Sequence, residues 1–146
     1  MAEEGGRLGR LSLIVTHLGE VCHRAGKSDE AEKCARRALE LARERKELGN
    51  QVYALRLLGL VAAEREPPDV GGAKQYFGEA LDLAERLTMR PLLARCHLGL
   101  GRLYRRFGEA GAAEHHLTKA SQLFEAMGMT FWLGRLALDR VAPLLT

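Results

Sequence analysis

The stretch His97–Ala120 reads HLGLGRLYRRFGEAGAAEHHLTKA, and it decides the fold of this 146-residue chain. It contains parts of three patterns that are typical of binding sites. GLG is part of many phosphate-binding loops, clustered arginines contact nucleic acids, and histidine is a common metal ligand. Four glycines in so short a stretch would ordinarily weaken a helix. Which interpretation holds depends on how the stretch relates to the rest of the chain.

The stretch is the third copy of an internal repeat. A Leu-Gly pair recurs at Gly19, Gly59 and Gly101, and two alanines seven residues apart follow it in every copy. The copies are spaced by 40 or 42 residues, which is typical of a helical repeat array. Small residues at a helix crossing permit close packing, so we predict that the recurring positions join the helices. The predicted packing residues are Leu18, Gly19, Ala31 and Ala38 in the first copy, Leu58, Gly59, Ala73 and Ala80 in the second, and Leu100, Gly101, Tyr104, Ala113 and Ala120 in the third.

Each copy is predicted to form two amphipathic helices joined by a short turn. Gly26 and Gly108 lie where the first helix of a copy ends and a left-handed residue is favoured. Pro67 and Pro68 stop the first helix of the second copy, because proline lacks the backbone donor. The predicted first helices cover about 8–25, 50–65 and 90–107, the second helices about 29–46, 70–87 and 110–126, and a seventh helix covers about 130–141.

At these positions the chain resembles the tetratricopeptide repeat family. The third copy carries the family's pattern most completely, with Leu100-Gly101, Tyr104, the turn glycine Gly108 and the two alanines. The resemblance implies an all-α fold, a right-handed superhelical solenoid of three helix-turn-helix repeats with a C-terminal capping helix. We expect a flexible N-terminus at 1–7, one domain at 8–141 with repeats at about 8–48, 49–88 and 89–127, and the capping helix at about 130–141.

A narrower resemblance concerns a particular group of proteins. The repeats are longer than the family's standard unit, and YALRLLGLVAAEREPPDV, MRPLLARCHLGLGRLYRRFGEAG and MGMTFWL lie in or between them. These segments are similar to the C-terminal repeats of bacterial signalling proteins that join an adenylate or guanylate cyclase domain to an ATPase module. The resemblance implies a role in bacterial signalling.

The three apparent sites in the opening stretch do not fit their chemistry. Tyr104 stands where a dinucleotide loop needs its third glycine, and the segment follows no strand. His115 and His116 are adjacent, so on a helix they point about 100° apart and cannot hold one ion together. The chain has no arrangement typical of a catalytic nucleophile and its base. We therefore predict no catalytic, metal or cofactor site, and a protein that is not an enzyme.

Composition and charge place the chain among folded globular proteins. Hydrophobic residues make up 47% and charged residues 28%, and the three cysteines form no CxxC pair. Reduced thiols and the lack of a signal peptide or membrane-spanning run predict a cytoplasmic protein without membrane contact. The net charge of +3 arises entirely in residues 91–146, which hold 7 basic and 4 acidic residues. This distribution favours an acidic partner at that end.

The family resemblance also implies where a partner binds. In such repeats the first helix of each unit lines a concave groove. Independently of the family, spacings of 7 and 3 place Arg95, Arg102 and Arg105 on one helical face. That face is either a solvated surface or a site for carboxylates. The candidate groove residues are Thr16, Glu20 and His23 in the first repeat, Tyr53, Arg56 and Leu60 in the second, and Arg95, Leu98, Arg102, Arg105 and Arg106 in the third.

Three functional hypotheses follow. The first is a protein–protein interaction module whose groove docks a protein or peptide segment, with an acidic one as the option that the arginines favour. The second is a scaffold that forms a homodimer through apolar end helices, especially around Phe131-Trp132-Leu133. RNA binding is the weakest of the three, because the positions that would read bases differ between repeats, as in Glu20, Leu60 and Arg102.

Overall fold

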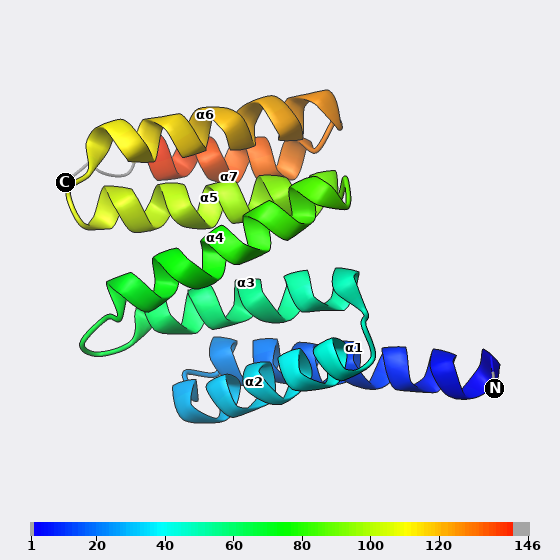
Figure 1. Ribbon diagram of the computed structural model, residues 1–146. Helices are drawn as coiled ribbons and strands as arrows, with labels where there is room; N and C mark the ends of the chain where they lie inside the picture. The colour runs from blue at the N-terminus through cyan, green and yellow to red at the C-terminus, as the bar shows by residue number, and fades with distance from the viewer. Residues whose placement is uncertain (1, 142–146) are drawn as a thin grey trace.

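The computed structural model describes residues 2–141, and all of its regular structure is α-helical. Within these residues, seven helices follow one another as antiparallel pairs along a stack, and the last described helix has no second member there (Figure 1). The helices are α1 (Ala2–Arg24), α2 (Ser28–Glu44), α3 (Leu48–Glu64), α4 (Val70–Arg86), α5 (Arg90–Arg106), α6 (Ala110–Ala126) and α7 (Thr130–Val141). The prediction of three helix pairs and a closing helix is confirmed.

The pairs are joined in order. Helix α1 packs on α2, α3 on α4 and α5 on α6, while α2 packs on α3 and α4 on α5 to link successive repeats. The first helices also contact each other directly, α1 with α3 and α3 with α5. We call α1, α3 and α5 the first-helix row. Within the described residues no helix is long and apolar enough to cross a membrane.

The N-terminal boundary differs from the prediction. Helix α1 begins at Ala2, whereas the sequence predicted a helix from about Leu8. The other helix boundaries lie within about two residues of their predicted positions.

The tight turns share one backbone geometry. After α1, the amide of Lys27 donates to the carbonyl of Cys22 at 2.8 Å and the amide of Gly26 donates to that of His23 at 3.1 Å, which is a Schellman arrangement. Such a turn needs one residue at positive φ. The residues at this position are Gly26 (φ 78°), Lys46 (57°), Thr88 (56°), Gly108 (81°) and Gly128 (68°).

The anchor glycines lie at close helix crossings. A Cβ built on Gly19 would be 2.8 Å from Cδ2 of Leu57, and one on Gly101 would be 2.6 Å from Cδ2 of Leu117. Carbon atoms in contact prefer about 3.5–4.0 Å, so each site excludes a larger residue unless its neighbour moves. The glycines of GLG are therefore helix-packing residues, and α5 runs through them without interruption.

Most of the other anchors lie in the core. The alanines at both repeat positions are at most 3% exposed, and Leu58 and Leu100 are 3% and 4% exposed. Tyr104 is only partly buried. Leu18 differs from the expectation, because 55% of its surface is exposed. The equivalent leucines are covered by the second helix of the preceding repeat, and no described helix precedes α1.

Candidate partner-binding face

The candidate groove residues do not form one open surface. One position of the repeat is buried in all three copies: Thr16 is 1% exposed, Arg56 9% and Leu98 2%. For Thr16 and Arg56 the cause is the direct packing of α1 on α3 and of α3 on α5. Leu98 instead belongs to a core cluster that also contains Leu117 of α6 and Leu136 of α7. Thr16 donates a hydrogen bond to the carbonyl of Ser12 at 3.0 Å. Thr16 and Leu98 thus lie in the interior rather than on a groove surface.

The remaining candidates of the first two repeats are partly buried. Nε2 of His23 lies 3.0 Å from a carboxylate oxygen of Glu64, so α1 and α3 share a polar contact near their C-terminal ends. Tyr53 packs against the core cluster that runs from α2 to α5. Leu60 is also half-buried. These residues mainly connect neighbouring helices.

The arginines of the third repeat contact the C-terminal helix. Nε of Arg102 donates to Oδ2 of Asp139 at 2.7 Å. Arg105 donates to the carbonyl oxygen of Asp139 at 2.6 Å, at the C-terminal end of α7, where the helix dipole favours a cation. The guanidinium of Arg95 stacks over the Trp132 ring, 5.1 Å from its centroid. Sequence reasoning placed α7 at the end of the stack but missed that it occupies this arginine face.

Arg106 makes a different contact. It donates to the carbonyl oxygen of Ala63 in α3 at 2.9 Å and is otherwise exposed. It therefore bridges two first helices. The arginines of α5 thus form neither a fully solvated face nor a binding surface that is wholly free, because α7 and α3 contact them.

Arg56 is the centre of a positively charged cluster. Its side chain comes from α3 and is buried, and Oε1 of Glu20 lies 3.9 Å from its Nη1. Burial, together with the charges of Arg95 and Arg102, lowers the pKa of Arg56 to about 10. Nε of Arg95 is buried and has no hydrogen-bond partner among the described residues. Among the residues that the structure describes, the guanidinium groups of Arg56, Arg95 and Arg102 thus face two carboxylates, those of Glu20 and Asp139.

The adjacent histidines of α6 have separate environments. Nδ1 of His116 lies 3.0 Å from Nδ1 of His97 in α5, and the His116 ring stacks on Tyr104. His115 is exposed. Burial and the neighbouring His116 lower the pKa of His97 to about 4, so this imidazole is neutral at pH 7. Among the described residues, no three His, Cys, Asp or Glu side chains converge as a metal site would need.

The arrangement of helix pairs agrees with the family whose models match the chain. Models of the tetratricopeptide repeat match residues 14–45 and residues 71–126, which together make 88 of the 146 residues. The chain therefore belongs to the tetratricopeptide repeat family. No curated protein matches the chain. Repeats of this family generally act as protein–protein interaction modules and are typically non-catalytic.

Proposed function

We propose that the chain is a non-catalytic interaction module that binds an acidic segment of a partner protein beside Arg56 and Arg95. The observation that supports this most directly is the uncompensated positive charge of the arginine cluster. A lowered pKa at Arg56 means that its surroundings disfavour its positive charge. A partner carboxylate that accepts from Arg95 would reduce this unfavourable interaction and satisfy the unpaired Nε.

Two finer proposals come from the sequence. The likeness of three segments to cyclase–ATPase proteins supports a place in bacterial signalling, and the unpaired cysteines support a reducing cytoplasmic compartment.

A homo-oligomeric scaffold is the second candidate function of the chain. The exposure of Phe131 (69%) and Leu138 (64%) on α7 supports it.

Trp132 is the natural probe for the proposed binding site. It is the one tryptophan of the chain, and Arg95 stacks on its ring. We expect a hexaglutamate peptide to change the Trp132 fluorescence saturably, with an affinity that falls as salt screens the charges. Hexaglutamine has the same length without the charge and should give no change.

The variant Arg95→Gln isolates the proposed contact. It should weaken hexaglutamate binding about fivefold or more, because it removes one charge-assisted hydrogen bond. Arg86→Gln is the matched control, since Arg86 is exposed in the last turn of α4. Since Arg95→Gln changes the surroundings of the tryptophan, the affinities are compared by calorimetry. Equal affinity of both variants and the unmodified chain would contradict the proposal.

A further inference from the structure

The outward face of α1 carries an exposed apolar seam. Leu11, Ile14, Leu18 and Val21 follow one another at spacings of 3, 4 and 3, so they share one side of the helix. Their exposed fractions are 41%, 60%, 55% and 59%. We call these four residues the α1 seam. Single exposed apolar residues are normal on a protein surface, but a continuous row of four is typical of an interface.

The internal repeat shows what covers this face elsewhere in the molecule. Three seam positions, those of Ile14, Leu18 and Val21, have counterparts 40 residues later in α3 and 82 residues later in α5. Helix α2 packs on α3, and α4 packs on α5. None of the counterparts is more than 4% exposed. They are Ala54, Leu58 and Val61 in α3, and Cys96, Leu100 and Leu103 in α5.

At each junction between successive repeats, one position near the end of the first helix makes a polar contact with the preceding first helix. Glu64 in α3 contacts His23 in the preceding first helix, and Arg106 in α5 contacts the carbonyl of Ala63. The equivalent residue of α1 is Arg24. It is exposed, and among the described residues it has no ion pair or side-chain hydrogen bond. Both the apolar and the polar positions of a repeat junction are thus present on α1, and no helix among the described residues packs against them.

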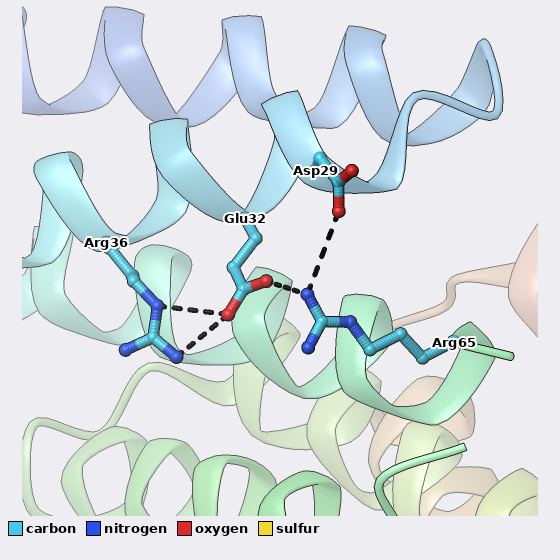
Figure 2. Close-up of polar contacts among 4 residues, drawn as sticks. All are labelled: Asp29, Glu32, Arg36 and Arg65. Atoms are coloured by element: carbon cyan, nitrogen blue, oxygen red, sulfur yellow. Dashed lines mark hydrogen bonds and ion pairs between the residues drawn. The ribbon is translucent and has the colours of Figure 1, made fainter. Parts of the chain in front are cut away.

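The covering helix of the first internal junction shows the charge that such a partner would carry. Glu32 in the first turns of α2 forms an ion pair with Arg65, which directly follows α3, and Asp29 lies 4.0 Å from the same guanidinium (Figure 2). Glu32 also accepts two hydrogen bonds from Arg36 of its own helix. At this junction carboxylates at the start of the covering helix meet a cation at the end of the covered helix. At the second junction the signs are reversed, because Lys74 of α4 contacts Glu109, which follows α5, at 3.2 Å. The start of the covering helix therefore carries the charge opposite to that at the end of the covered helix. On α1, that end carries Arg24.

A second copy of this chain is a poor match for the seam. Arg10, His17 and Arg24 recur every seven residues along one edge of the seam, and all three are exposed. If two copies of α1 paired antiparallel about a two-fold axis, this row would face the same row of the other copy. Arg10 of each copy would then oppose Arg24 of the other copy, so like charges would meet at both ends of the contact.

We infer that the α1 seam is a docking site for an amphipathic helix of a partner protein. That helix presents alanine and leucine to the seam and carboxylates in its first turn to Arg24. It lies on α1 as α2 lies on α3. This site is separate from the arginine cluster and extends the stack by one helix.

The test uses the full chain and a helical peptide with the chemistry of α2. The probe is a peptide of residues 28–44 with Cys34→Ser and Arg37→Glu and a fluorescent label. A lactam bridge joins the amine of Lys33 to the carboxyl group introduced at position 37, and both positions face solvent. We expect it to bind the full chain and to slow amide hydrogen exchange of α1. The double variant Ile14→Glu/Leu18→Glu should weaken binding about tenfold or more, because two apolar contacts are lost.

Control variants test whether a loss of peptide binding is specific to the α1 seam. Leu138→Glu changes an exposed leucine of α7 and should leave the affinity unchanged. Arg24→Glu should weaken binding about threefold through the lost ion pair. Circular dichroism checks that the variants stay folded, which is expected because the substituted residues are exposed.

Three results would overturn the inference. One is the absence of peptide binding up to about 1 mM, and another is binding that the double variant does not weaken. The third is a dimer, seen by light scattering of the full chain alone, that dissociates in the double variant, because a second copy would then cover the seam.

Discussion

The ring of Phe77 lies against the backbone of Gly99, where an added Cβ would be 2.6 Å from Cε1 of the ring. The other edge of the same ring faces Gly59, with a distance of 2.9 Å from an added Cβ to Cδ2. One aromatic side chain of α4 therefore fills the space between α3 and α5. Phe77 is 1% exposed, so the ring has little room to move away from either glycine.

Gly99→Ala should destabilise the protein although alanine is the better helix former. The added methyl group overpacks the contact with Phe77, and we expect a loss of about 1–3 kcal/mol in the free energy of unfolding. Urea unfolding followed by circular dichroism measures it. The double variant Gly99→Ala/Phe77→Leu should recover part of the free energy of unfolding that is lost through overpacking. Removal of the ring itself also lowers the free energy of unfolding, so the recovery is incomplete.

Gly78→Ala is the matched control for this substitution. Gly78 lies within α4, and a Cβ there would have nothing within 4 Å. The variant should gain up to about 1 kcal/mol of stability from helix propensity alone. If both variants shifted stability in the same direction, steric contact at Gly99 would not be the cause.

The turn after α4 stores a local strain that glycine would relieve. Thr88 adopts φ 56°, a conformation that is unfavourable for a β-branched residue. Thr88→Gly should raise the free energy of unfolding by about 0.5–1 kcal/mol, since part of the gain is offset by the greater backbone entropy of glycine. The melting temperature reports the change.

The reciprocal substitution tests the same explanation in an equivalent turn. Gly108 has φ 81° and nothing within 4 Å of an added Cβ, so Gly108→Thr introduces backbone strain without a clash. It should lower stability by a similar amount. An unchanged melting temperature in both variants would show that φ at this turn position does not limit stability.

The repeat periodicity predicted the helix pairs and the glycine crossings. Both depend on the spacing of apolar and small residues along each helix, and this spacing recurs in each copy. Leu18 shows where this reasoning fails: the periodicity marks a residue for burial, but burial also requires a neighbouring helix, and no described helix packs there. The contact between Arg102 and Asp139 joins residues 37 apart on α5 and α7. Its pairing comes from the docking of α7, which periodicity does not specify.

Asp139→Asn should loosen α7. The substitution removes the charge that Arg102 contacts, and for a partly exposed pair we expect a loss of about 0.5–1 kcal/mol. Because Trp132 lies on α7, its fluorescence should shift to longer wavelength as the helix detaches from Arg95. Glu125→Gln removes an exposed carboxylate of α6 and serves as the control. Identical spectra for both variants would show that the ion pair does not hold α7.

The histidine pair makes stability depend on pH. The pKa of His97 is about 4 in the folded chain, below the ordinary value of 6.5, mainly because the ring is buried and next because His116 is close. The pKa of His116 is lowered as well, first by burial and then by His115. A depressed histidine pKa favours folding fully above about pH 6.5. The contribution is lost as the pH falls from about 6.5 to 4, because only the unfolded chain takes up the protons there.

His97→Gln should flatten this acid dependence. Glutamine keeps a polar group beside His116 but does not titrate, so the decrease in stability between pH 7 and pH 4.5 should shrink by about 1–2 kcal/mol, allowing for solvent screening of a half-buried site. Urea unfolding at a series of pH values measures the slope, and His17→Gln on exposed α1 surface controls for loss of a histidine elsewhere. A slope equal to that of the unmodified chain would mean that His97 takes up its proton over the same pH range in the folded and the unfolded chain, and the lowered pKa would then be contradicted.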